Sequence, residues 1–285
     1  MTFAKAFPHV SIGSAEHHAI IRKLSTYVQL ERMGLSGSKD KSAWESGRNL
    51  ITLPFAGLDI LGEVRSCKGR KSGPVKVFEV GCGKGHTLRT LKTIEGDTVH
   101  VDGITLTKNA ADYAAGKFDD PDVYNVLAKV FQLLPLDGPE IKKVEPVKVR
   151  VGLIEGADIQ HQDFIFSFEA MRYVFDPARA LEKIANGLST NNGNAVLEVP
   201  EGFLEEGIGK GIREHLKRNG IIFRMELVRT RILGLLGKAA RYFIYMQRNS
   251  DIKVDLNPFY KIRTEDAYQD PGGDGRNLKS SSWAH

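Results

Sequence analysis

Three alternating glycines, Gly81, Gly83 and Gly85, follow a hydrophobic run that ends at Val80, and a segment with helical apolar spacing begins directly after them. Glycine lets the chain turn sharply and lets a ligand lie against bare backbone. The first turn of the helix behind such a loop presents amides that have no partner within the helix. The pattern therefore predicts a strand, a ligand-binding loop and a helix in succession.

The spacing of the glycines and one acidic residue discriminate between two ligands. A dinucleotide-binding loop has the pattern Gly-x-Gly-x-x-Gly, whereas here the third glycine comes one residue early and is followed by His86. Glu79 stands two residues before the first glycine. Its carboxylate would repel a pyrophosphate and attract a ligand that carries an ammonium and a sulfonium group. The loop, with Cys82 as a small filler, therefore favours S-adenosyl-L-methionine over NAD as cofactor.

The segment Glu79-Val80-Gly81-Cys82-Gly83-Lys84-Gly85 resembles motif I of the class I (Rossmann-like) S-adenosylmethionine-dependent methyltransferases. The similarity extends from Val75 to Gln247. The resemblance implies that Glu79 and the backbone from Gly81 to Gly85 hold the methionine part of the cofactor. It also implies a seven-stranded sheet whose last strand is antiparallel.

The second predicted strand leads into Thr105 and Leu106, where most of the family has an acidic residue that binds both ribose hydroxyls. The stretch is similar to the Gly-Leu-Thr-Leu-Ser-Lys-Asn pattern of the mycolic-acid cyclopropane synthases, a branch of the superfamily that also has Thr. We expect Thr105 and Leu106 to contact the cofactor, with a weaker grip than a carboxylate gives. Thr105 could equally cap the next helix, and the role of Asp102 is open.

Asp158 follows the third predicted strand, at the place where the family has an acidic residue that meets the adenine amino group. The resemblance therefore implies that Asp158 contacts adenine. The connection is shorter than usual, and a solvated loop carboxylate is the competing interpretation.

The fourth predicted strand and the closing Asp176-Pro177 resemble the family's post-strand segment, whose residues face the transferring methyl group. The resemblance implies that Ser167 belongs to the cofactor site and that Arg172 contacts the substrate. Glu169 is the candidate catalytic base, needed only if the acceptor must lose a proton, and Tyr173 is a positioning hydroxyl. Glu169 and Tyr173 could instead be ordinary residues at a helix start.

Several patterns are missing from the sequence. No Asp/Asn-Pro-Pro-Tyr/Phe quartet follows the fourth strand, which argues against the enzymes that methylate amino groups of DNA and RNA. Arg172 stands where cyclopropane synthases have a Glu, which argues against lipid cyclopropanation. No cluster of His, Cys and Asp has the spacing of metal ligands, so no metal is expected.

Apolar runs that alternate with helix-length segments predict a doubly wound α/β fold with a mainly parallel, buried sheet. The last two runs are joined by a short link and are expected to form an antiparallel hairpin at one edge of the sheet. The predicted strands are 75–80, 98–104, 147–151, 163–168, 195–199, 221–228 and 242–247, and the predicted helices between them are 87–94, 108–115, 176–188 and 208–219.

The two ends of the chain and one internal segment depart from this alternation. A helix is predicted from a cap at Ser14 to Gly34, and a second from Pro54 up to a basic linker at residues 66–74. Residues 116–146 are too long for a simple connection and are expected to be a helical insertion. We therefore expect an N-terminal helical extension (1–72), a cofactor-binding domain (73–249) and a loose polar tail (250–285).

Composition indicates a globular protein of 285 residues, in which 40 Lys and Arg offset 35 Asp and Glu to a net charge of +5. This surplus is thin and forms no dense run, so it supports a nucleic-acid partner only weakly. No stretch approaches the roughly 20 apolar residues that span a bilayer, and the N-terminus lacks a signal-peptide core. We expect a cytoplasmic protein in which Cys67 and Cys82 are reduced.

Three functions are compatible with these features. The favoured one is methyl transfer from S-adenosylmethionine to a small-molecule acceptor by in-line displacement, with the N-terminal helices and the insertion covering the methyl donor. One alternative is an RNA or protein methyltransferase, suggested by the positive net charge. The other is an inactive cofactor-binding partner module, suggested by the absence of the acidic residue that binds the ribose hydroxyls in most of the family. The sequence does not identify the acceptor or the oligomeric state.

Overall fold

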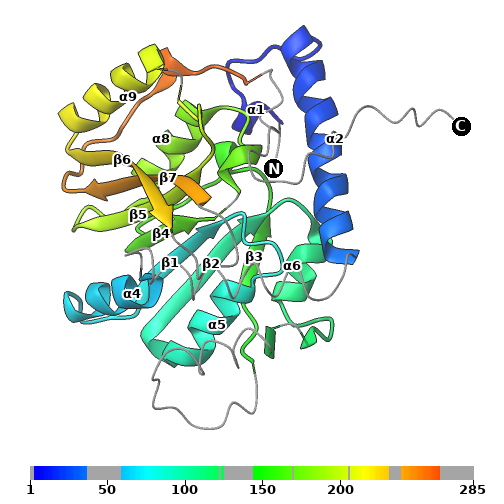
Figure 1. Ribbon diagram of the computed structural model, residues 1–285, viewed down its shortest axis with the longest axis vertical. Helices are drawn as coiled ribbons and strands as arrows, with labels where there is room; N and C mark the ends of the chain where they lie inside the picture. The colour runs from blue at the N-terminus through cyan, green and yellow to red at the C-terminus, as the bar shows by residue number, and fades with distance from the viewer. Residues whose placement is uncertain are drawn as a thin grey trace, which may run out of the picture.

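The computed structural model describes residues 3–36, 59–121, 123–124, 144–168, 170–204, 206–230 and 239–263 (Figure 1). Its strands are β1 (Val75–Val80), β2 (Val99–Thr105), β3 (Lys148–Val151), β4 (Phe164–Ser167), β5 (Gly193–Val199), β6 (Ile221–Thr230) and β7 (Ala239–Arg248). In the described part of the chain these strands form one seven-stranded sheet in the order β3-β2-β1-β4-β5-β7-β6.

The pairing of the strands confirms the predicted fold class. Strands β1 to β5 run parallel to one another, whereas β7 lies antiparallel between β5 and β6. β1 has the predicted bounds, and the hairpin strands β6 and β7 extend beyond theirs. The sheet is therefore the mainly parallel one expected, with an antiparallel hairpin at one edge.

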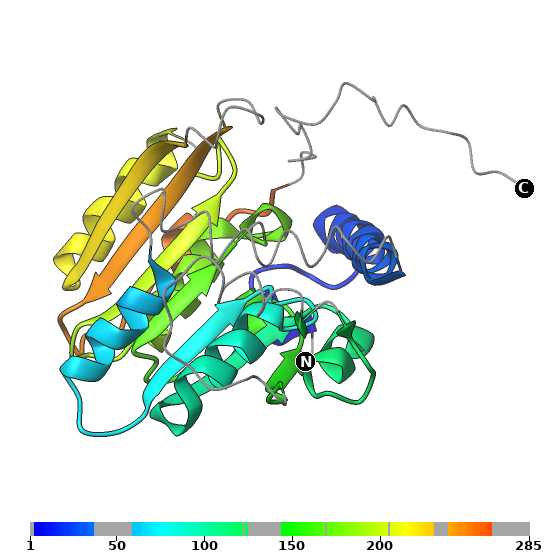
Figure 2. The same ribbon diagram turned by 60° about the horizontal axis from the view of Figure 1, so that its bottom comes forward.

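Helices cover both faces of the sheet (Figure 2). One face carries α4 (Ile60–Gly69), α5 (His86–Glu95) and α6 (Lys108–Ala114), and the other carries α8 (Pro177–Gly187) and α9 (Glu206–Arg218). Short 3₁₀ turns are η1 (Gly96–Thr98), η2 (Ile154–Gly156), η3 (Met171–Tyr173) and η4 (Asn257–Phe259). Among the helices that the structure describes, none combines the length and the apolar character needed to cross a bilayer.

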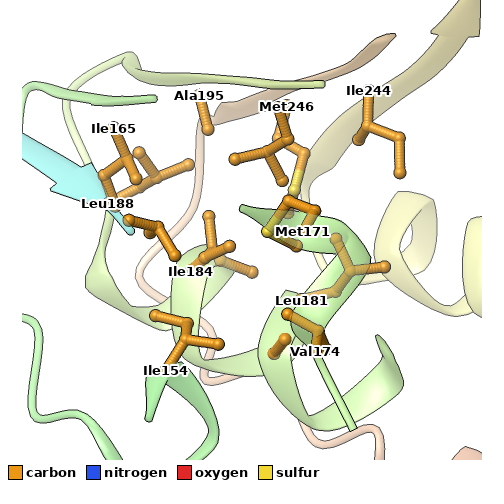
Figure 3. Close-up of a cluster of buried hydrophobic side chains, with 14 of the residues drawn as sticks. Ile154, Ile165, Met171, Val174, Leu181, Ile184, Leu188, Ala195, Ile244 and Met246 are labelled. Carbon is orange, nitrogen blue, oxygen red and sulfur yellow. The ribbon is translucent and has the colours of Figure 1, made fainter. Parts of the chain in front are cut away.

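The core cluster beneath α8 also supports the loops at the carboxyl edge of the sheet. Leu181 and Ile184 of α8 are fully buried against Ile165 of β4 and Ile244 of β7. Figure 3 shows that Ile154 of η2 and Met171 of η3 belong to the same cluster. The segments that follow β3 and β4 are therefore anchored to the core by apolar contacts.

The N-terminal extension packs on the segment that follows β4. It consists of α1 (Phe3–Ala6) and α2 (Ala15–Ser36). The Ser14 hydroxyl oxygen accepts a hydrogen bond from the amide of His17 at 3.1 Å, as expected for the cap of α2. The predicted end at Gly34 is wrong, because α2 continues to Ser36; a single glycine within a helix costs only about 1 kcal/mol. Phe7 and Ile20 are buried with Phe175, which fixes the extension to the carboxyl edge of the sheet.

Helix α4 differs from the prediction at both ends. Asp59 is extended and caps the helix by accepting a hydrogen bond from the Gly62 amide at 2.8 Å, so the helix begins at Ile60, and residues 54–58 lie outside the described part. The linker predicted from Ser66 is wrong, because the helix continues to Gly69 and buries Cys67 against the sheet. The proposed domain division at residues 72 and 73 stays a prediction.

The segment directly after β7 is packed, although the sequence predicted a loose tail from residue 250. Val254 and Leu256 are fully buried against α8. The Asn186 side chain bonds both the amide and the carbonyl of Val254, and Glu182 accepts a hydrogen bond from the Leu256 amide at 2.7 Å. The prediction is therefore wrong for residues 250–263. Residues 264–285, and most of the predicted insertion, lie outside the described part of the chain.

Arg248, at the end of β7, joins this packed segment to α8. Its side chain is 6% exposed, and its guanidinium donates hydrogen bonds to backbone carbonyls. The accepting residues are Ala185, Asn186, Leu188, Ser250, Asp251 and Ile252. No other side-chain type can serve so many carbonyls in a fixed planar arrangement.

Arg248→Met should lower the free energy of unfolding by about 3 kcal/mol, because it leaves buried carbonyls without a donor. Arg213→Met on the exposed side of α9 is the matched control and should change it by less than about 0.5 kcal/mol. Equilibrium unfolding in urea measures both. Equal effects of the two substitutions would show that Arg248 does not hold the segment.

Candidate functional site

The loop between β1 and α5 contains three glycines with left-handed backbone conformations. Their φ angles are +75° at Gly81, +51° at Gly83 and +72° at Gly85. Residues with a Cβ adopt such angles only with strain, so the sharp bend requires this glycine spacing. The bend brings the N-terminus of α5 directly over the carboxyl end of β1.

The three glycines meet different surroundings. A Cβ on Gly81 would lie 2.0 Å from the Cβ of Ala170, and a Cβ on Gly85 would lie 2.9 Å from the Cβ of Ala114. A Cβ on Gly83 would meet nothing within 4 Å. Gly81 and Gly85 are therefore required by packing within the protein, whereas Gly83 borders open space that a ligand can occupy.

Three backbone amides of the loop also form hydrogen bonds within the protein. Gly81 and Cys82 donate to the carbonyl of Ile104 at 2.9 and 3.0 Å, and Gly85 donates to the carbonyl of Cys82 at 2.7 Å. These three amides hold the loop against β2 and close its turn. The amides of Gly81, Cys82 and Gly85 are therefore already used within the protein.

Glu79 is a buried carboxylate on β1 just before the loop. Its side chain is 6% exposed, and its Oε2 atom has no hydrogen-bond partner among the described residues. Burial raises the pKa of Glu79 to about 8, although a hydrogen bond from Thr87 opposes the shift. A buried carboxylate that lacks a counter-charge is unfavourable, so this site is suited to a ligand that brings a positive charge.

The end of β2 excludes one of the two interpretations of Thr105, namely that it caps the next helix. Thr107, not Thr105, caps α6, because its hydroxyl oxygen accepts a hydrogen bond from the Ala110 amide at 3.3 Å. Thr105 is 2% exposed and lies at the last position of β2, where its carbonyl accepts from Gly152 at 2.8 Å. The capping alternative for Thr105 is therefore wrong. Leu106 is half-buried in the same turn.

Asp102 and Arg150 position the segment that contains Asp158. The carboxylate of Asp102 on β2 pairs with the Arg150 guanidinium on β3 at 2.5 Å. Arg150 also donates to the backbone carbonyl of Asp158. The side chain of Asp158 is exposed and accepts from Gln160 at 3.1 Å. The role of Asp102, open from the sequence, is thus to brace the segment after β3.

The segment after β4 lies against the glycine loop, as the contact of Ala170 with Gly81 shows. Ser167 is fully buried, and its hydroxyl donates to the carbonyl of Val80 at 3.0 Å, which ties the ends of β4 and β1 together. Tyr173 is half-buried on η3 and packs edge-on against Tyr27 of α2, with ring centroids 5.0 Å apart. Arg172, also on η3, is half-buried. Glu169, the predicted base, lies outside the described residues.

Sequence reasoning missed the structural role of Glu155. This side chain is fully buried, and its Oε1 accepts from the amides of Phe175 and Asp176 at 2.7 and 3.3 Å. Asp176 is the cap of α8, accepting from the Arg179 amide at 3.0 Å. Burial raises the pKa of Glu155 and raises that of Asp176 to about 7. The segments after β3 and β4 are therefore joined by a buried carboxylate that local sequence gave no reason to select.

His86, the residue that departs from a dinucleotide loop, also has a partner that the sequence did not reveal. Its Nε2 lies 2.7 Å from Oδ2 of Asp120, and both side chains are 2% exposed. Asp120 belongs to the first residues of the predicted insertion. The pair therefore fixes the entry of the insertion to the N-terminus of α5, beside the glycine loop.

Comparisons with known proteins give likenesses of fold at low sequence identity. No family model and no curated protein matches the chain. A plantazolicin methyltransferase, BpumL, solved with a pentazolic desmethylPZN analog and SAH, is 12% identical over 82% of this chain and 98% of its own, with a TM-score of 0.46. A putative sarcosine dimethylglycine methyltransferase from Galdieria sulphuraria is 15% identical over 67% of this chain and 84% of its own, with a TM-score of 0.41. A SAM-dependent methyltransferase from Aquifex aeolicus is 16% identical over 65% of this chain and 88% of its own, with a TM-score of 0.37.

The topology of the sheet itself decides the fold. Resemblance of the loop to motif I implied a seven-stranded sheet with an antiparallel last strand. The observed sheet has seven strands in its described part, and β7 is the antiparallel one. The chain therefore has the mainly parallel sheet with an antiparallel β7 that the resemblance to the class I S-adenosylmethionine-dependent methyltransferases implied.

Proposed function

We propose that this chain binds S-adenosyl-L-methionine at the carboxyl edge of β1 and β2 and transfers its methyl group to a small-molecule acceptor. The observation that carries the proposal is the buried carboxylate of Glu79, whose Oε2 lacks a partner among the described residues. The ammonium and sulfonium groups of the cofactor supply the missing positive charge, whereas a pyrophosphate would add a negative one.

The open space at Gly83 supports the placement of this ligand. The amides of Gly81, Cys82 and Gly85 are engaged within the protein, and Gly83 alone of the three loop glycines borders open space that a Cβ would enter. We assign the methionine part to Glu79 and Gly83, the ribose to Thr105 and Leu106, and the adenine to Asp158. Cys82 fills the turn behind the loop, and Ser167 acts indirectly by holding Val80 in place.

Methyl transfer needs alignment more than activation. When bound, the cofactor would supply a methyl group activated by its sulfonium sulfur, which would be left as a neutral thioether once the acceptor has taken the methyl group. The protein holds the acceptor in line and excludes water. We assign substrate contact to Arg172, positioning to the Tyr173 hydroxyl, and the base, where the acceptor must lose a proton, to Glu169.

The N-terminal extension favours a small acceptor over a macromolecule. Tyr27 of α2 packs on Tyr173 and Phe175, at ring-centroid distances of 5.0 and 5.4 Å. The rings of Phe7 and Phe175 are edge-on, with their centroids 5.8 Å apart. Aromatic contacts thus hold the extension over the segment after β4, where it narrows access to the methyl group.

Gly83→Ala should weaken the binding of S-adenosylmethionine and of S-adenosylhomocysteine by at least about 100-fold, because the added Cβ enters the space assigned to the ligand. Isothermal titration calorimetry measures both affinities. Gly202→Ala is the matched control: Gly202 also has a positive φ, +69°, and open space around its Cβ, so it reproduces the backbone strain alone. Unchanged affinity of Gly83→Ala, or equal losses in both variants, would contradict the assigned site.

Binding of the cofactor should release a proton from Glu79. The unliganded pKa is about 8, so the group is mainly protonated at neutral pH. A cation beside it favours the carboxylate and lowers that pKa, so affinity should rise with pH by up to about tenfold between pH 6 and pH 7.

Calorimetry in two buffers with different ionisation enthalpies gives the number of protons released, which we expect to approach one at pH 7. The Glu79→Gln variant should bind the cofactor more weakly and should release no proton on binding. Without ligand, the same substitution should raise Tm at pH 8. The pKa of Glu79 is higher in the folded chain than in the unfolded chain, so the carboxyl lowers the stability of the fold increasingly as the pH rises toward the folded pKa, whereas a glutamine does not. Wild-type binding without proton release would remove Glu79 from the proposed role.

A further inference from the structure

Strand β6 forms an open edge of the sheet. Among the described residues it pairs with β7 and with no other strand. The exposed fractions of its apolar side chains are 49% at Ile222, 40% at Met225 and 40% at Leu227. Figure 2 shows the β6–β7 hairpin at the side of the molecule away from α2. A long edge with exposed apolar side chains presents unpaired amides and carbonyls to which another strand can add.

The sequence of β6 is self-complementary about Met225. In an antiparallel pair, residues directly opposite each other have their side chains on the same face of the sheet. If such a pair of β6 strands from two copies is centred on Met225, the residues that lie opposite each other are Met225 and Met225, Arg224 and Glu226, Phe223 and Leu227, and Ile222 and Val228. One face of the pair would then hold apolar contacts, and the other would hold two ion pairs flanked by aliphatic contacts.

Charge selects this register over its neighbours. A two-fold axis perpendicular to a continuous sheet maps each face onto itself, so one residue must lie opposite its own copy. Centring on Arg224 places two arginines together, and centring on Glu226 places two glutamates together; like charges directly opposite are destabilising. Only the register centred on Met225 places Arg224 opposite Glu226.

The two charged side chains are available for this exchange. Within one chain the Nη1 of Arg224 lies 3.6 Å from the Oε1 of Glu226, and the side chains are 64% and 46% exposed. An exposed pair of this kind contributes little to the stability of a single chain. Across a two-fold axis, Arg224 of each copy pairs with Glu226 of the other, and these two ion pairs also fix the register of the two β6 strands.

We propose that two copies of this chain associate through β6 as an antiparallel pair centred on Met225, so that their sheets become continuous. The partner is a second copy because the charges and the apolar residues complement themselves. This inference is independent of the proposed cofactor.

Charge reversal tests the proposal on the full-length chain by analytical ultracentrifugation. The unmodified chain should be a dimer at micromolar concentration. Arg224→Glu faces glutamate with glutamate, Glu226→Arg faces arginine with arginine, and each should raise the dissociation constant at least tenfold. Both positions are exposed, so the fold should be retained, as circular dichroism will verify.

Mixing the two reversed chains should restore the dimer as a heterodimer, because each Glu of one chain then faces an Arg of the other. The double variant R224E/E226R should dimerise with itself for the same reason. A monomeric unmodified chain would overturn the proposal. A dimer that neither single reversal weakens would also overturn it, since association would then use another surface.

A disulfide provides a second test of the register. Met225→Cys places two thiols at the two-fold axis, where opposite Cα atoms lie about 4.5–5.5 Å apart, a separation that a disulfide can bridge, so oxidation with diamide should link the two chains. Ile222 is 49% exposed, more than the 40% of Met225, but it lies six positions from its own copy in this register, so Ile222→Cys should not link. The native Cys67 and Cys82 are buried and should not compete. Equal linking of both variants, or none with Met225→Cys, would refute the register.

Discussion

The site depends on one unfavourable feature, a carboxylate held in the interior beside a bend of the chain. Keeping Glu79 protonated near neutral pH, with a pKa of about 8, costs roughly 3 kcal/mol relative to the ionised group in an unfolded chain. The rest of the edge supports this arrangement: Thr87 contacts the carboxyl, and the loop is fastened to Ile104. A cationic ligand would turn the same feature into a favourable one, and this is the basis that we propose for selectivity against a pyrophosphate.

Sequence patterns predicted the scaffold of this site because its causes are local. Strands buried on both faces appear as apolar runs, and β1 has the predicted bounds. The cap at Ser14 was predictable because a helix start needs a side-chain acceptor at one defined position. The glycine spacing predicted the bend, although it did not separate Gly83, which borders open space, from Gly81 and Gly85, which are required by packing.

The failures have the opposite cause, since they depend on contacts between residues far apart in the sequence. Glu155 was not singled out from the sequence, because its hydrogen bonds come from a segment 20 residues later. Polar composition after residue 250 suggested a loose tail, but alternate residues Val254 and Leu256 are buried against α8, and the donors of Arg248 fix the turn. Thr105 and Thr107 are both possible caps by type, and only the backbone geometry shows that Thr107 is the one used.

The position of the hairpin reconciles an open edge with an accessible site. Strand β7 lies between β5 and β6, so β6 is the edge strand at the end of the sheet that is farther from β1. The glycine loop lies at the carboxyl end of β1, and three strands, β4, β5 and β7, separate β1 from β6. Association of two copies through β6 therefore leaves the carboxyl edge of β1 and its cover, α1 and α2, facing solvent. The same topology that creates the site keeps it apart from the surface available for self-association.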